Sequence, residues 1–269
     1  MNDKINVLNS PPVVLPRYGY LHVREDLRLI SNLVEQTEYE SVKRGLRLAN
    51  RYHLTPFNFD KEIEKVSKDG LVFLPISRVK NYSGFIHEHI YINDIDQNTL
   101  IYGVIAKDLD VAKDFVDAHN NEVDHKSIGE MLGYPECCRN AFVKFWERSF
   151  DPIQEIAKET TGHKNCVDGV TTIIENADPN LYVHLRYFGI RIIPFFPCSY
   201  HCEESKNFAK KWISLMKDID SKTTDKLLKL INMPSKWDLY NAQIIVSHPY
   251  FMGRATSYYD INRKVVVFR

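Results

Sequence analysis

The sequence has few cysteines and no long apolar run. Five of its 269 residues are cysteines, and an odd number is unlike the disulfide framework of a small secreted protein. The first twenty residues contain no continuous apolar stretch of the kind found in signal peptides. No apolar run reaches the roughly 20 residues that span a bilayer. We therefore expect a cytoplasmic protein without a membrane partner.

The sequence also has no excess of either charge, because it contains 35 basic and 35 acidic side chains. Broad, non-specific nucleic-acid binding depends on clustered lysine and arginine, so we do not expect it here. The sequence contains neither a Walker phosphate loop nor a G-x-G-x-x-G motif, and the close triplet of cysteines found in radical-SAM enzymes is missing. A nucleophile-elbow serine is missing too. ATP, NAD and serine-nucleophile chemistry therefore have no support.

What is present indicates an α+β protein. Helical spacing runs from Arg24 to Ala49 with a break near Thr37, and a helix with an aspartate cap fits Asp108 to Ala118. Further helices are expected around the cysteines up to Lys217 and over residues 222–231. Strand-like runs cover residues 70–76, 85–92, 99–106, 190–196, 242–248 and 264–269.

These elements predict an N-terminal mixed or antiparallel sheet with helices, followed by a helical cysteine-bearing region and C-terminal strands. The predicted domains are an irregular arm over residues 1–16, an α+β lobe over residues 17–120 and a cysteine-containing α+β lobe over residues 121–269. The two lobes could equally form one continuous domain.

The first cysteine-bearing stretch, GYPECCRNAFVKFW, places Cys137 and Cys138 at the start of a helix. Pro135 suits the first helical turn, where its missing N–H would have no partner in any case. The free N–H groups and the positive dipole end of such a turn favour an anion, so we expect a lowered thiol pKa there. Consecutive helical residues point about 100° apart, so both sulfurs serve one site only in an irregular turn or around a cluster.

The second stretch, FPCSYHCEESKNFAKKW, repeats this arrangement. Cys198 and Cys202 lie between an apolar run and an amphipathic helix, with Ser199 as the expected N-cap. An irregular turn can direct two cysteines four residues apart towards one point. Each stretch therefore offers two thiolates beside a helix N-terminus.

Several interpretations of these two pairs remain open. Cys-x₃-Cys spacing is typical of zinc sites, but adjacent cysteines are not. Adjacent cysteines are easier to place around an iron–sulfur cluster such as 4Fe-4S, where neighbouring sulfurs can bind different irons, so iron–sulfur is our first choice and zinc the alternative. A metal-free dithiol and two pairs of buried cysteines are the other interpretations.

The elements LGYPECCRNAF and PCSYHCEES together resemble an uncharacterised domain family of archaea and bacteria. That family carries an LGYP-x-CC element and a later PCS-x-x-C element. The resemblance implies that the four cysteines belong to one site. It implies no reaction.

Other residues near these stretches could contact a substrate. His201 lies between Cys198 and Cys202 and is the candidate catalytic residue. The candidate substrate-binding residues are Tyr134, His184, Arg186, His248 and Arg254.

We expect a metalloenzyme with a cysteine-ligated iron–sulfur cluster that acts on a small molecule or a modified nucleotide. The first alternative is a zinc-stabilised module that binds nucleic acid or protein through the N-terminal sheet. The second alternative is a thiol redox protein.

Overall fold

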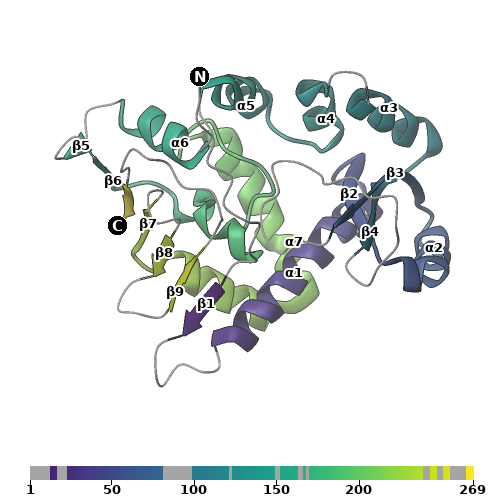
Figure 1. The fold of residues 1–269 in the computed structure, drawn as a ribbon, viewed down its shortest axis with the longest axis horizontal. Coiled ribbons are helices and arrows are strands. Elements are labelled where there is room, and N and C mark those ends of the chain that lie inside the picture. The colour runs from purple at the N-terminus through teal and green to yellow at the C-terminus, as the bar shows by residue number, and fades with distance from the viewer. Residues whose placement is uncertain are drawn as a thin grey trace. The chain divides into compact units, whose positions relative to one another are not determined.

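The computed structural model describes residues 13–16, 23–80, 99–120, 123–148, 152–162, 166–167, 170–238, 243–246, 251–254 and 265–269 (Figure 1). For residues 13–16, 80, 146–148, 166–167 and 251–254 it describes the backbone alone. The chain divides into two compact units. The first consists of Met1–Glu35, Tyr82–Phe85 and Lys144–Arg269, and the second of Gln36–Asn81 and Ile86–Val143. The predicted domain boundaries stay a prediction.

The second unit is built on a three-stranded antiparallel sheet. Its strands are β2 (Ala49–Leu54), β4 (Thr99–Ala106) and β3 (Val72–Lys80), in that order. The predicted strand at residues 99–106 coincides with β4, and the one at 70–76 overlaps β3. The expected strand at 85–92 and the loop at 93–98 lie outside the described residues. Strand β2 was not predicted, because its alternation of buried and exposed residues is short and begins where the helical pattern was expected to end.

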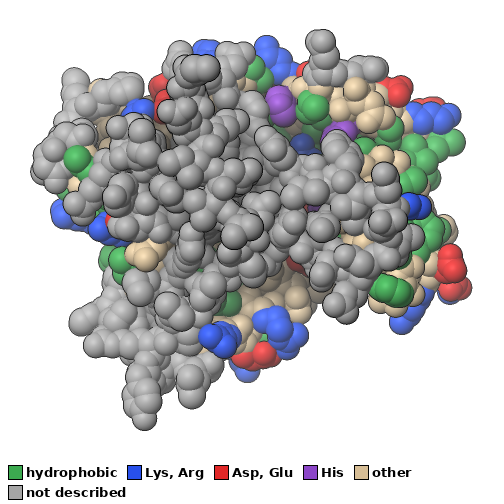
Figure 2. Space-filling view, viewed as in Figure 1, with side chains coloured by type: hydrophobic (Ala, Val, Ile, Leu, Met, Phe, Trp, Pro, Cys, Tyr) green, Lys and Arg blue, Asp and Glu red, His purple; other side chains and the backbone are tan. Residues whose placement is uncertain are grey.

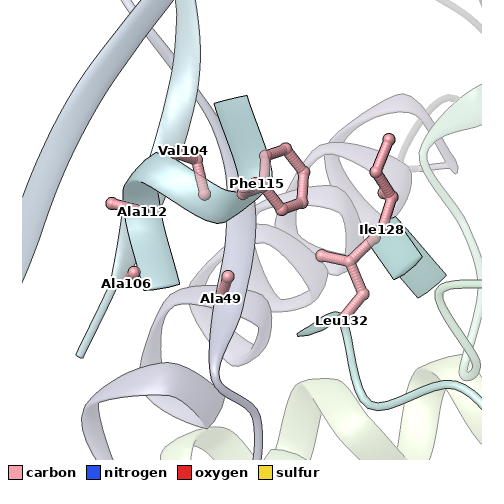
Figure 3. Packing of buried hydrophobic residues seen from close by; sticks show 7 residues of the cluster. All are labelled: Ala49, Val104, Ala106, Ala112, Phe115, Ile128 and Leu132. Atoms are coloured by element: carbon pink, nitrogen blue, oxygen red, sulfur yellow. The ribbon is translucent and has the colours of Figure 1, made fainter. Parts of the chain in front are cut away.

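Each face of this sheet carries its own core. On one face Ala49, Val104 and Ala106 pack with Phe115 and other residues of the helices α3 (Leu109–Asn120) and α4 (His125–Met131), as Figure 3 shows. On the other face Ile105 packs against residues of α1 (Val23–Lys43) and α2 (Phe59–Lys68). This division follows from the alternation of side chains along a strand.

Two helix predictions can be compared with the structure. The aspartate cap of α3 is confirmed, because Asp108 Oδ1 accepts a hydrogen bond from the Val111 N–H at 2.9 Å. The predicted break near Thr37 is wrong, since α1 runs unbroken from Val23 to Lys43. Thr37 is fully buried, and it extends the buried stripe of the helix. A β-branched residue lowers helix propensity only slightly, so burial outweighs that cost.

The first unit contains a seven-stranded sheet in the order β1-β9-β8-β7-β10-β6-β5. Its described pairs are antiparallel except for β10 with β6, which is parallel. The strands are β1 (Val13–Pro16), β5 (Cys166–Val167), β6 (Thr171–Ile174), β7 (Ser235–Asp238), β8 (Gln243–Val246), β9 (Phe251–Arg254) and β10 (Val265–Phe268). Strands β8 and β10 confirm the two predicted C-terminal runs, whereas β1 lies within the segment expected to be an irregular arm.

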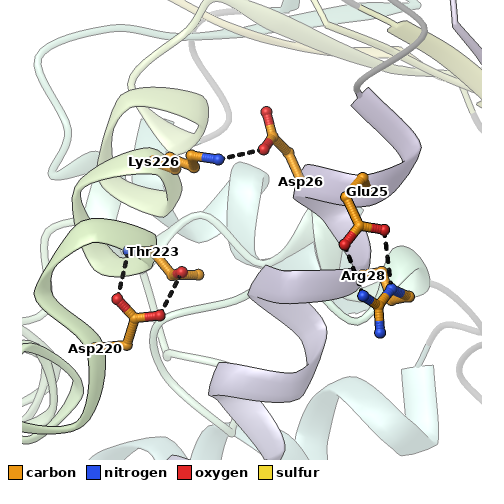
Figure 4. A network of polar contacts seen from close by, with 6 residues as sticks. All are labelled: Glu25, Asp26, Arg28, Asp220, Thr223 and Lys226. Atoms are coloured by element: carbon orange, nitrogen blue, oxygen red, sulfur yellow. Dashed lines mark hydrogen bonds and ion pairs between the residues drawn. The ribbon is translucent and has the colours of Figure 1, made fainter.

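Helices complete the first unit. They include the start of α1, α6 (Pro152–Thr161), which packs against β6 and β10, and α7 (Glu203–Ile231). The chain bends within α7 at Asp220, where φ is −152° and ψ is 95°. The Asp220 carboxylate accepts hydrogen bonds from the Thr223 N–H at 2.9 Å and from its hydroxyl at 2.6 Å, so it caps the second half of the helix. Lys226 in that half forms an ion pair with Asp26 of α1 (Figure 4). The two helices predicted here are thus one kinked helix.

The predicted strand at residues 190–196 is wrong. This segment is largely buried but has no strand structure, and it follows a short 3-10 helix, η3 (His184–Phe188). Gly189, with φ of 74°, ends that helix. Pro194 and Pro197 cannot donate to a sheet, so a central strand would lose ladder hydrogen bonds at these positions.

The helical middle and C-terminal strands otherwise agree with the predicted α+β class. Two further elements are the 3-10 helices η1 (Pro56–Asn58) and η2 (Pro179–Leu181), and α5 (Glu136–Arg148) carries the first cysteine pair. Within the described part of the chain, every helix is too short or too polar to cross a lipid bilayer.

The core of the second unit can be tested with two phenylalanine substitutions. Phe115 is fully buried, whereas Phe57 is 73% exposed. Phe115→Ala should lower the free energy of unfolding by about 3–5 kcal/mol, because it removes buried area and leaves a cavity. Phe57→Ala should change it by less than about 0.5 kcal/mol. Urea denaturation measures both values, and equal effects would contradict the described packing.

Candidate metal centre

The first cysteine pair is positioned by the turn between α4 and α5. Helix α4 ends at the buried Leu132, and Gly133 follows in the left-handed conformation with φ of 71°. The Gly133 N–H donates to the Glu130 carbonyl and the Tyr134 N–H to the Gly129 carbonyl, both at 2.8 Å. This is a glycine C-cap, in which a side chain larger than hydrogen would be strained. The LGYP element therefore ends one helix and directs the chain into the next.

Helix α5 begins directly after Pro135. The Pro135 carbonyl accepts hydrogen bonds from the N–H groups of Cys138 and Arg139, each at 3.0 Å. Cys137 and Cys138 thus lie in the first helical turn, as predicted. Cys138 is buried and Cys137 exposed. Their sulfur atoms are 3.8 Å apart, so adjacent positions in this turn do bring both sulfurs to one place.

The second pair is positioned by a turn anchored in the core of the first unit. Tyr200 is fully buried at the centre of this turn. Its backbone N–H donates to the Thr160 hydroxyl of α6 at 2.9 Å. Its ring meets those of Tyr182 and Phe268 edge-on, with centroids 5.4 and 5.5 Å away. This anchor was not predicted, because a tyrosine between two cysteines gives no sequence signal for its partners.

The N-cap of α7 is Cys202, and the expectation that Ser199 caps the helix is wrong. The Cys202 sulfur accepts a hydrogen bond from the Ser205 N–H at 3.5 Å. Ser199 instead lies a turn earlier, where its carbonyl accepts from the Cys202 N–H at 3.2 Å and its hydroxyl from the His201 N–H at 3.3 Å. Ser199 accepts the hydrogen bond that closes the turn before the helix. Cys202 is therefore the residue next to the first helical turn, and its sulfur is the cap.

The sulfur atoms of Cys137, Cys138, Cys198 and Cys202 all lie within 4.8 Å of one another. None of these four cysteines forms a disulfide bond. We call this group the cysteine cluster. It could hold a metal ion, as the two matching sequence stretches predicted. Cys138 and Cys202 are buried, Cys198 is half-buried and Cys137 is exposed.

Backbone dipoles favour negative charge on this cluster. Cys137 and Cys138 lie in the first turn of α5, and Cys202 caps α7. Both helices present their N–H groups and the positive ends of their dipoles at these positions. The Ser205 N–H shows one such group directed at a sulfur. These dipoles favour the thiolate, which is the form that binds metal, whereas burial of Cys138 and Cys202 opposes it.

The other candidate residues have different surroundings. His201 is exposed in the turn between Cys198 and Cys202, and its catalytic role stays a prediction. Tyr134 is half-buried in the turn before α5. His248 lies outside the described residues. Arg254 belongs to β9, and its side chain lies outside the described part of the structure.

His184 is fully buried in the first unit. Its ring stacks on Phe268 with centroids 4.0 Å apart, and its Nε2 lies 2.7 Å from the Ser235 hydroxyl. Burial lowers the pKa of His184 to about 3. The neighbouring Arg186 guanidinium stacks over the Phe196 ring at 4.1 Å. Both residues contact protein side chains, and substrate binding by them stays a prediction.

Comparison with known proteins identifies one family. Residues 104–235 match the family model described as "Protein of unknown function (DUF483)". The match is consistent with the uncharacterised family that the two cysteine elements resemble, and it includes all four residues of the cysteine cluster. No curated protein and no solved structure matches the chain.

Burial of neutral His184 predicts a pH dependence of stability. An unfolded histidine has a pKa of about 6.5, so below that pH the unfolded state binds a proton that the folded state excludes down to about pH 3. Stability is therefore lost as the pH falls through this range. From pH 6 to pH 4 the wild type should lose roughly 2–3 kcal/mol more than His184→Gln. Urea denaturation across this range measures the difference, and parallel pH profiles would contradict the buried neutral imidazole.

Proposed function

We propose that this chain, whose residues 104–235 match a family of unknown function, is a zinc-binding protein. In this proposal Cys137, Cys138, Cys198 and Cys202 bind one ion in a tetrahedral site. The observation that carries it is the approach of four sulfurs to within 4.8 Å of one another. When bound, zinc would cross-link the first turn of α5 to the turn before α7.

The sulfur distances fit a single ion. A tetrahedral ion with metal–sulfur bonds of about 2.3 Å places its sulfurs about 3.8 Å apart. The two sulfurs of Cys137 and Cys138 are 3.8 Å apart, and no pair in the cluster exceeds 4.8 Å. Small side-chain rotations suffice to bring such a group to tetrahedral geometry.

The same distances bear on the choice of metal. An iron–sulfur cluster binds its thiolates through separate irons, so its sulfurs spread more widely than the ligands of one ion. The adjacency of Cys137 and Cys138 favoured a cluster when only the sequence was considered. The 3.8 Å approach of their sulfurs removes the need for separate irons. A single tetrahedral site with four sulfurs is typical of zinc.

Electrostatics support a divalent cation at this position. Four thiolates within this distance repel one another strongly, and two of them belong to buried residues. The helix dipoles of α5 and α7 offset part of that repulsion. A bound divalent cation would offset much more of it, because it is the largest local charge in such a site. Binding would release the protons of the thiols, so affinity should fall at acidic pH.

A site closed by four protein ligands leaves no position for a substrate. We therefore propose a stabilising role for zinc, in a protein that recognises another molecule elsewhere on its surface. This is the zinc-stabilised binding module among the predicted functions.

One observation favours a catalytic centre as the second candidate. Cys137 is exposed, unlike the buried Cys138 and Cys202. An exposed ligand is the one that a small molecule or modified nucleotide could displace, which would open the metal for Lewis-acid chemistry. In that case the nearby His201 and Tyr134 are candidates for substrate contact.

Metal analysis of the purified protein tests the zinc proposal. Protein prepared without oxygen should be colourless and contain about one zinc per chain by mass spectrometry. Cys138→Ser and Cys202→Ser should lose the zinc and melt at a markedly lower temperature, because structural zinc contributes on the order of 10 kcal/mol. Arg28→Gln, at an exposed residue of α1 paired with Glu25, is the control and should keep both. A brown protein containing several irons per chain would contradict the proposal.

Serine replacement of Cys137 separates the two candidate roles. With a closed structural site, Cys137→Ser should weaken zinc binding and lower the melting temperature as Cys138→Ser does. Competition with a colorimetric zinc chelator and thermal unfolding measure these two effects. A Cys137→Ser protein that keeps its zinc and its wild-type melting temperature would instead support the catalytic centre.

A further inference from the structure

A group of basic side chains gathers on one face of the sheet in the second unit. Arg51 and His53 lie two residues apart on β2, so their side chains leave the same face. His119 lies in the last turn of α3, and His125 is the first residue of α4. Figure 2 shows histidine side chains at the surface in the region where Figure 1 draws α4. We call these four residues the basic cluster.

Tyr102 holds the cluster together. It lies on β4 directly opposite His53 and is only 1% exposed. Its ring is 5.1 Å from that of His53 and 5.4 Å from that of His119, measured between centroids. Its side chain also forms a hydrogen bond with Arg51. One buried ring thus contacts three members of the cluster.

Packing fixes the fourth member. The His125 ring meets the Phe142 ring of α5 edge-on at 5.3 Å. The side chain of Asp124, which precedes it, is engaged in capping α4, where it accepts hydrogen bonds from the Lys126 and Ser127 N–H groups. The cluster is therefore built from three elements of a single unit, and each side chain is held by an aromatic contact or a hydrogen bond.

The cluster combines accessibility with positive potential. His119 and His125 are half-buried, and Arg51 and His53 keep accessible atoms although protein surrounds most of each charged or ring group. Desolvation and the Arg51 charge lower the pKa of His53 to about 4. The same two causes lower the pKa of His119 and of His125. The Arg51 charge acts on all three imidazoles, so the cluster has a positive electrostatic potential. A bound anion would neutralise part of it.

We propose that Arg51, His53, His119 and His125 bind the phosphate group of a small molecule. The arginine supplies a planar fork of donors that matches phosphate oxygens. The three imidazoles supply further N–H donors from different directions, which suits a tetrahedral oxyanion better than a flat carboxylate. None of these four residues is a cysteine ligand, so the phosphate proposal can be tested separately from the zinc proposal.

Affinity should depend on pH in one direction. The groups that face the cluster are Arg51 and His53 on β2, Tyr102 on β4, His119 on α3, His125 and Asp124 on α4, Tyr134 before α5 and Glu38 on α1. A bound anion raises the histidine pKa values, so binding takes up protons. Anion affinity therefore increases as the pH falls from 8 towards 5.5.

Calorimetric titration of the full-length protein, as purified with its metal, tests the proposal. The probes are inorganic phosphate and ribose 5-phosphate, with acetate at matched ionic strength as the carboxylate control. We expect saturable binding of at least one phosphate probe and at least tenfold weaker binding of acetate. Tighter binding of ribose 5-phosphate would identify a phosphate ester as the ligand, and equal binding would identify free phosphate. No saturable binding of either phosphate probe would overturn the proposal.

Variants connect the binding to the named residues. Arg51→Gln should weaken phosphate binding at least tenfold, whereas Arg28→Gln, at an exposed arginine paired with Glu25 on α1, should leave it unchanged. His53→Gln is the second variant, since its exposed side chain can be replaced if Arg51→Gln does not fold. The pH dependence of affinity is measured with sulfate, because sulfate stays a dianion from pH 8 to pH 5.5. Equal affinities in the wild type and in a folded Arg51→Gln or His53→Gln protein would overturn the assignment.

Discussion

The approach of four sulfur atoms from two distant stretches is the interaction on which the proposed metal site depends. No disulfide bond joins these sulfur atoms, so the fold must hold them there by other means. It does so with two anchors that contain no sulfur. The left-handed Gly133 and the buried Leu132 fix the turn before α5, while the buried Tyr200 fixes the turn before α7. Packing and backbone geometry thus position each pair of ligands within its own part of the fold.

Local patterns made much of this fold predictable. The strand-like apolar run at residues 99–106 predicted β4 with its observed bounds, and Asp108 marked the start of α3. The proline before Cys137 marked the start of α5. These signals share one physical basis, because each depends on residues within a single turn or strand. The meeting of the two cysteine pairs is long-range, and it was predicted because both stretches carry the same arrangement and because the family resemblance implies one site.

Where tertiary contacts decide the structure, the sequence was misleading. The buried run at residues 190–196 reads as a strand because apolar periodicity reports burial and not hydrogen-bond pairing. Its Pro194 was the available evidence against a central strand. Thr37 suggested a break in α1, but its full burial keeps the helix continuous. At the start of α7 the cap is the sulfur of Cys202 and not the expected Ser199. The hydrogen-bonded turn before the helix decides which residue reaches the cap position.

The two proposed sites divide the chemistry of the chain between them. A centre closed by four thiolates offers no donors to an incoming molecule, whereas the basic cluster presents arginine and histidine N–H groups at an accessible surface. The basic cluster left no sequence motif, since Arg51 and His119 are brought together by the pairing of β2 with β4 and the packing of α3. His119, His125 and all four cysteines lie within the family match, but Arg51 and His53 precede it. A protein that holds metal in one place and recognises phosphate in another therefore needs the β2 strand as much as the matched segment, because that strand supplies the permanent positive charge.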